Sequence, residues 1–308
     1  MADAKISSFA SHGTPVGADY VASVLASGPT SKKLLLSDAR DYFGLVYTAA
    51  SPTTADVTGV INTLHALDIS GLTAARNLVL PATAAVGDRV GVLITVTHTT
   101  AGREILIKGD TGDSIIAGNA TYTATEWSRI WMAGEMVILR CTVANSTWVI
   151  EVDGRIPSMG FLRLSTAAPA TEASNVYYYP TVPASGSPGA WTADVDFGNC
   201  TDVTTDKIKV RRACNAVVGA WVLCAGALGD QKAFTVQIEK NGTTQILYQK
   251  VISSGAQGNA YMPALSQAAV FAAGDYIRFK YRTEEVNMGA AANAVIPYTG
   301  MSFVEVLK

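Results

Sequence analysis

Residues 233–252, AFTVQIEKNGTTQILYQKVI, decide the fold that this sequence predicts. Apolar and polar side chains alternate from Phe234 to Glu239, as in a β-strand with one buried face. The dipeptide Asn241-Gly242 follows, and it is the strongest short signal for a two-stranded hairpin. Residues 246–252 then return as the partner strand. The stretch therefore predicts an antiparallel hairpin.

Similar strands lie on either side of this hairpin. Gly274-Asp275 is a turn signal that precedes an alternating strand, Tyr276–Arg282, and the chain closes with another strand, Ser302–Leu307. Strands and turns recur at the spacing typical of roughly eight short antiparallel strands in one sandwich. The segment 156–308 is therefore expected to be an antiparallel jelly-roll sandwich.

The composition of the 308 residues favours an all-β protein throughout. Val, Ile, Thr and aromatic residues recur in short runs between clusters of Gly, Asn, Asp and Pro. The length permits two or more domains. Three segments differ in texture: an extended N-terminal segment, 1–44, a β-rich domain, 45–155, and the predicted jelly roll, 156–308.

The first two segments carry different signals. Residues 1–44 are too few for a globular core, so they are expected to pack on other subunits or on a larger assembly; Ser37 would cap a short helix that ends at Gly44. In the second segment turn signals separate short predicted strands. These are residues 64–69, 77–80, 89–97, 104–108, 136–143 and 147–152.

Charge and hydropathy exclude several classes of protein. The net charge is −2, which gives no electrostatic case for nucleic acid or a membrane surface. The start, MADAKISSFASHG, lacks the pattern of a signal peptide. The longest apolar run, Ala216–Leu228, is too short to cross a bilayer. We expect synthesis in the cytoplasm, without membrane insertion.

No motif in the sequence indicates an enzyme or a cofactor. The histidines at 12, 65 and 98 are far apart and have no catalytic context. Glu284-Glu285 is an acidic pair, but neighbours in a strand point to opposite faces. We therefore predict no catalytic, cofactor-binding or metal residues and no enzymatic activity.

The spacings of the cysteines and aspartates likewise match no metal-binding or redox motif. Cysteines 141, 200, 214 and 224 form no C-x-x-C pair, so buried free thiols are expected. The acidic stretch Asp194–Asp202 fails as an EF-hand loop, because Asn199 and Thr205 stand where Gly and Glu are needed. A looser calcium site on this loop stays open.

Two predicted strands each carry a basic face. One interpretation is a site for an anionic partner such as an acidic surface glycan. The other is an ordinary solvated face, or a subunit contact neutralised by Glu284, Glu285 and Glu305. The cations concerned are Lys207, Lys209 and Arg211 on one strand and Arg278, Lys280 and Arg282 on the other.

Aromatic residues form a second candidate surface. Tyr177, Tyr178, Tyr179 and Trp191 lie in the loop-rich start of the third segment. Exposed aromatics serve recognition of sugars and proteins, but these side chains equally fit a connector that packs on the jelly roll. Trp127 and Trp131 in the second segment have the same two interpretations.

The first two segments resemble phage proteins. Residues 5–44, KISSFASHGTPVGADYVASVLASGPTSKKLLLSDARDYFG, are similar to the N-terminal segment of phage tail fibres, with Phe9 in place of the usual Leu. The second segment resembles a β-module of phage fibres, through Leu78–Pro81, Val86–Val90 and the closing strand Trp148–Ile150. These resemblances imply a virion anchor followed by a structural stalk domain.

The third segment resembles the trimeric jelly roll of complement globular heads and tumour-necrosis-factor ligands. The matching stretches are Gly219–Trp221, Val236–Gly242, Ala272–Ile277 and Ser302-Phe303. Val304 follows where those proteins usually have Gly. The resemblance implies a homotrimer in which apolar and aromatic residues meet at the three-fold axis.

Three functions follow from these resemblances. The first is a homotrimeric tail fibre or spike component, located in the virion, anchored to other virion proteins by residues 1–44 and binding a host-surface glycan or protein with its C-terminal head. The second is a capsid head-decoration, cement or head-fibre protein. The third is a polysaccharide depolymerase, which would need paired carboxylates in a groove.

Overall fold

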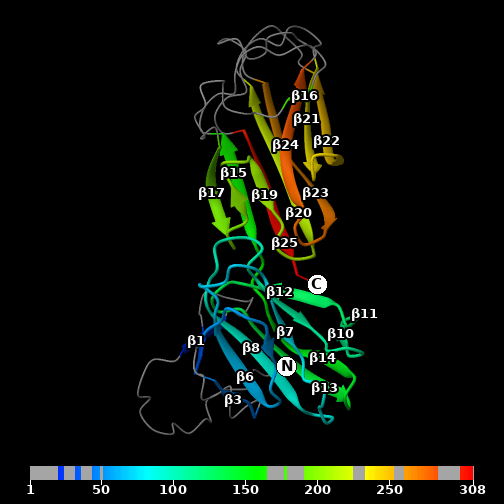
Figure 1. Cartoon of the computed structure of the whole chain (residues 1–308). Coiled ribbons are helices and arrows are strands. Elements are labelled where there is room, and N and C mark those ends of the chain that lie inside the picture. The colour runs from blue at the N-terminus through cyan, green and yellow to red at the C-terminus, as the bar shows by residue number, and fades with distance from the viewer. Residues whose placement is uncertain are drawn as a thin grey trace, which may run out of the picture.

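The computed structural model describes two β-sandwiches that lie end to end (Figure 1). It describes residues 20–23, 32–35, 44–48, 51–164, 177–178, 191–224, 233–252, 260–283 and 299–307. Within these ranges the regular elements are all strands, which confirms the all-β prediction. The predicted helix after Ser37 falls on residues up to 43 that lie outside the described ranges; Gly44, its predicted end, is described. The N-terminal segment contributes a separate antiparallel pair, β1 (Tyr20–Ser23) with β2 (Lys32–Leu35).

The first domain, residues 46–154, is built from an eight-stranded and a four-stranded sheet. The larger sheet has the order β11-β10-β14-β13-β8-β6-β3, with β4 also on β6; the smaller has the order β12-β9-β7-β5. The strands are β3 (Val46–Tyr47), β4 (Ser51–Pro52), β5 (Val57–Thr58), β6 (Thr63–Asp68), β7 (Arg76–Val79), β8 (Arg89–Val96), β9 (Ile105–Lys108), β10 (Ser114–Ala117), β11 (Ala120–Thr123), β12 (Glu126–Ile130), β13 (Met136–Val143) and β14 (Thr147–Gly154).

The chain winds between these two sheets from β5 to β10, changing sheet at each strand. Neighbours within a sheet are consequently parallel: β5, β7 and β9 on one side, and β3, β6 and β8 on the other. The core between the sheets is apolar and contains three tryptophans, Trp127, Trp131 and Trp148. Trp131 and Trp148 are fully buried.

The second domain, residues 159–306, is a jelly-roll sandwich of a five-stranded sheet, β17-β15-β25-β20-β23, and a six-stranded sheet, β18-β19-β24-β21-β22, with β16 also on β24. All its strand pairs are antiparallel. Its strands are β15 (Met159–Leu164), β16 (Tyr177–Tyr178), β17 (Trp191–Phe197), β18 (Thr201–Asp202), β19 (Lys207–Lys209), β20 (Cys214–Cys224), β21 (Ala233–Lys240), β22 (Thr244–Ile252), β23 (Ala260–Phe271), β24 (Tyr276–Thr283) and β25 (Gly300–Val306).

The predicted hairpin is confirmed as β21 and β22. Asn241 and Gly242 both have left-handed backbones, with φ of +55° and +73°, as a type I′ turn requires. The Thr243 amide donates to the Lys240 carbonyl across the turn, at 3.2 Å. Val236 and Ile238 point into the core and are fully buried.

A second turn holds this hairpin tip in place. The Asn241 side-chain amide donates to Asp275 Oδ1 at 2.6 Å, and the Tyr276 amide donates back to Asn241 Oδ1 at 3.0 Å. The predicted strand after Gly274-Asp275 is confirmed as β24, which lies beside β21. The two turn signals in the sequence therefore stabilise each other in space.

Candidate interaction surfaces and the domain junction

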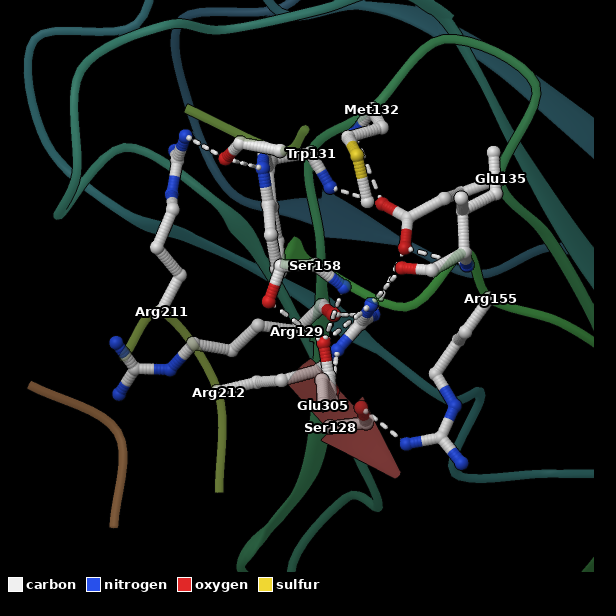
Figure 2. Close-up of polar contacts among 12 residues, drawn as sticks. Ser128, Arg129, Trp131, Met132, Glu135, Arg155, Ser158, Arg211, Arg212 and Glu305 are labelled. Atoms are coloured by element: carbon white, nitrogen blue, oxygen red, sulfur yellow. Dashed lines mark hydrogen bonds and ion pairs between the residues drawn. The ribbon is translucent and has the colours of Figure 1, made fainter. Parts of the chain in front are cut away.

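Two consecutive arginines, Arg211 and Arg212, join the two domains (Figure 2). They follow β19 of the second domain, and both side chains are buried. Arg212 donates from Nη1 to Glu135 of the first domain at 2.7 Å, and from Nε to Glu305 of the second at 2.6 Å. Its remaining bonds reach Glu305 Oε2 and the carbonyls of Arg129 and Ile156. All five N–H groups of the guanidinium are thus used.

Glu135 and Glu305 are also fully engaged. Glu135 Oε2 accepts the backbone amides of Trp131 and Met132, at 2.6 and 2.8 Å. Glu305 Oε2 accepts the backbone amide and the hydroxyl of Ser158, both at 2.8 Å. Burial by itself lowers the pKa of Arg212, but the two carboxylates outweigh it and raise that pKa overall. Buried charges persist only when paired and hydrogen-bonded in this way.

Arg211 makes a second connection beside the first. Its Nε donates to Glu104 of the first domain at 2.8 Å, and its other nitrogens donate to the carbonyls of His98 and Thr100. Both guanidinium groups lie over the Trp131 ring, 4.6 and 4.5 Å from its centroid, and the Trp131 indole donates to the Gly198 carbonyl. We call this set of contacts the ionic joint. It fixes the second domain on the first.

The five-stranded sheet of the second domain has a second apolar face, turned away from the core. Register places Phe197, Met159, Val304 and Val217 in one row across β17, β15, β25 and β20, and side chains in such a row share a face. Phe197 is 49% exposed and Val217 is 38% exposed. The apolar sheet face, as we name it, consists of Met159, Phe161, Val195, Phe197, Val217, Val270, Val304 and Val306.

The two predicted basic strands do lie side by side. β19 pairs with β24, and alternation along these strands places four of the cations on one sheet face: Lys207, Lys209, Arg278 and Lys280. Arg282 also belongs to β24. The side chain of Arg282 lies outside the described part. Three of the cations have acidic neighbours within the chain: Lys209 with Asp202 at 2.7 Å, Arg278 with Asp206 at 3.6 Å and Lys280 with Glu239 at 2.6 Å. Lys207 lies over the Tyr276 ring.

Arg211 does not belong to that face, so this part of the prediction is wrong. The side chain is 2% exposed, because the strand ends at Lys209 and the chain turns into the ionic joint. Glu305, expected to neutralise the basic face, lies in the same joint. Glu284 and Glu285 lie outside the described residues.

The four aromatic residues predicted as a recognition surface do not form one cluster on the described surface. Trp191 is 3% exposed and packs edge-to-face on Phe279 in the core, so it is not a surface aromatic. Tyr177 and Tyr178 form β16 and pair with β24. Tyr179 lies outside the described residues. Nothing in the sequence indicated the role of Arg212, since a cation after an alternating strand carries no signal of the residues that it will contact.

The acidic stretch that was considered for calcium and the cysteines have structural roles. Asp196, in the acidic stretch considered for calcium, accepts the backbone amides of Cys200 and Thr201 and closes a turn. In the described ranges no group of three or more His, Cys, Asp or Glu is arranged to hold a metal ion. Cys141, Cys200 and Cys214 are buried thiols outside any disulfide, as expected, and burial raises the pKa of Cys200. No described helix is long and apolar enough to cross a membrane.

Comparisons with known proteins give a structural likeness for part of the chain. No family model matches the sequence, and no curated protein matches it. Crystal structures of murine APRIL are similar to 49% of this chain over 100% of their own length. The identity is 14% and the TM-score 0.35 for the structure at pH 5.0, and 18% and 0.32 for that at pH 8.0. The assignment of the jelly roll rests on the strand order given above.

Proposed function

We propose that this chain is a homotrimeric bacteriophage fibre or spike component that binds the host surface and catalyses no reaction. Residues 1–44 would attach it to other virion proteins, the first domain would act as a stalk, and the second as the head. The proposal takes its phage origin from the resemblances of the sequence. The structure supplies two features that suit the role.

The apolar sheet face carries the proposal of a trimer. Five of its side chains, Val195, Phe197, Val217, Val270 and Val306, are each more than a third exposed in the single chain. They share one face, with Asn215 between Val270 and Val306, and exposed apolar side chains gathered in this way are typical of a subunit interface. A second and a third copy would remove it from water.

The ionic joint suits a protein that holds a binding head away from a particle. A flexible linker would let the head move freely, whereas Arg211 and Arg212 attach it through buried ion pairs with Glu104, Glu135 and Glu305. Three heads held in one orientation would bind a repetitive cell surface with avidity.

Mass and adsorption measurements test this function. Light scattering on the full chain at micromolar concentration should give three times the monomer mass of 32.3 kDa. The purified protein should also block adsorption of the particle that carries it, and should release no reducing sugar from host polysaccharide. A monomer, or adsorption that is unaffected by saturating protein, would overturn the proposal. Imaging that places the chain on the capsid would favour a decoration role instead.

A further inference from the structure

A cleft of about 650 Å³ opens between the two domains, beside the ionic joint. The first domain contributes the β10–β11 hairpin, β12 and β14, and the second contributes the ends of β20, β23 and β25. The volume lies within the range of roughly 300–1,000 Å³ that is usual for small-molecule sites. The sequence could not show this cleft, because its two walls come from different domains.

The floor of the cleft is a continuation of the core face of the β10–β11 hairpin. Ile115 on this face is fully buried, and Tyr122 is its cross-strand partner. Towards the hairpin tip the same face passes beyond the core, so Ala120 is exposed and lines the cleft. Tyr122, which is half-buried, lines the cleft as well, whereas the Trp127 indole on β12 is only 8% exposed and has the Arg155 guanidinium over its ring. The floor is therefore apolar and partly aromatic.

Carboxylates stand in fixed positions around this floor. Both oxygens of Glu126 accept hydrogen bonds from Arg129, at 2.6 and 2.9 Å. Both oxygens of Asp153 accept from Arg155, whose guanidinium lies 4.6 Å from the centroid of the Trp127 ring. A carboxylate oxygen with one such bond keeps a lone pair that can accept from a ligand hydroxyl.

We infer that this cleft binds a short neutral saccharide. Aromatic and aliphatic side chains match the C–H faces of a sugar ring, and the held carboxylates and the amide of Asn119, which also lines the cleft, match its hydroxyls. The charges of Glu126 and Asp153 are already balanced by Arg129 and Arg155, so the cleft offers no net attraction to an acidic sugar. The inference rests on the proposed function and names its ligand class and its site.

The cleft lies apart from the basic strands β19 and β24, which contribute none of its lining residues. The sequence left an acidic glycan there as one of two interpretations, but Lys209, Arg278 and Lys280 have acidic neighbours within the chain. Val270 and Val306 line the cleft and also belong to the apolar sheet face. A neighbouring subunit on that face would thus border the cleft.

A matched pair of variants tests the cleft. Ala120 and Thr121 are adjacent exposed residues of β11, and only Ala120 faces the cleft. The full chain, Ala120→Trp and Thr121→Trp are applied to a printed array of neutral and acidic bacterial surface oligosaccharides, and affinity for the best ligand is measured by calorimetry. We expect a neutral oligosaccharide to bind the wild type, with affinity reduced at least about tenfold in Ala120→Trp and unchanged in Thr121→Trp.

Three outcomes would overturn the inference. They are wild-type binding to acidic sugars alone, equal effects of the two tryptophans at equal melting temperatures, and no binding anywhere on the array. Adsorption assays separate this failure from failure of the proposed function. If the wild-type protein blocks adsorption but binds no neutral sugar, the saccharide site in the cleft is disproved and the proposed fibre function stands. A protein that does neither disproves both.

Discussion

Arg212 Nη1 lies 2.7 Å from Glu135 Oε1, although the two residues are 77 positions apart and belong to different domains. The same guanidinium is bound to Glu305, near the C-terminus of the chain. Such buried pairs are costly to desolvate and give little net stability compared with an apolar contact. Their geometry is specific, however, because a planar guanidinium with five donors accepts one arrangement of partners. The ionic joint therefore determines orientation more than it determines stability.

Removing Arg212 should destabilise the protein strongly. In Arg212→Met the carboxylates of Glu135 and Glu305 remain buried without their cation. We expect a loss of about 3–5 kcal/mol in the free energy of unfolding. Calorimetry should also show separate transitions for the two domains in place of a coupled one.

An exposed pair provides the control for this change. Arg163 binds Asp194 at 2.7 Å, but the two side chains are 29% and 40% exposed. Arg163→Met should therefore cost less than about 1 kcal/mol. Similar losses in the two variants would show that burial at the joint is unimportant.

A charge on the apolar sheet face should break the trimer. Val217 lies in the middle of that face and is 38% exposed, so Val217→Asp places a carboxylate in the proposed interface without disturbing the core. Light scattering should give the monomer mass, with an unchanged circular dichroism spectrum. The control is Tyr248→Asp, at a 44% exposed residue on the other sheet. A trimeric Val217→Asp variant would contradict the assignment of this face.

Asp275 should contribute stability that depends on pH. Burial by itself raises the pKa of this carboxyl, but hydrogen bonds from Asn241 and the Ala272 amide, together with Lys240, lower it below the usual 3.8. A lowered pKa in the folded state means that the contribution is present above the unfolded value and is lost as the pH falls through the folded one.

The variant Asp275→Asn isolates this effect. It should be less stable than the wild type by about 1–2 kcal/mol at neutral pH, and the gap should narrow as the pH falls below about 4. Urea unfolding at neutral pH and at about pH 3 measures both values. A gap that is the same at both pH values would rule out the carboxylate as its source.

Gly300 should tolerate no side chain. A Cβ built there would lie 2.6 Å from the Leu162 carbonyl oxygen and would also meet the indole of Trp221, its cross-strand partner. Gly300→Ala should cost about 1–3 kcal/mol by overpacking. Gly71→Ala is the control, since a Cβ there would make only an ordinary contact of 3.8 Å with Thr54. Thermal unfolding compares the two, and equal melting temperatures would contradict the steric argument.

The strands that were predicted and those that were missed differ in composition. Met136–Val143 is rich in apolar residues and was expected with the bounds that the structure has. Ser114–Ala117 and Ala120–Thr123 were not expected. They are short, carry Ala and Thr, and are stabilised as strands by pairing with each other and with β14. Short segments of this kind depend on tertiary contacts for their structure.

The sequence by itself determined the all-β class, the hairpin at Asn241-Gly242 and the strand after Gly274-Asp275. These features depend on period-two alternation and on turn residues, which act over a few neighbouring positions. Only the tertiary structure decided the parallel winding of the first domain, the burial of Arg211 and Arg212, and the cleft between the domains. Each of these depends on partners far away in the chain, such as Glu104, 107 residues before Arg211. Local pattern carries no information about which distant side chains will meet a given residue.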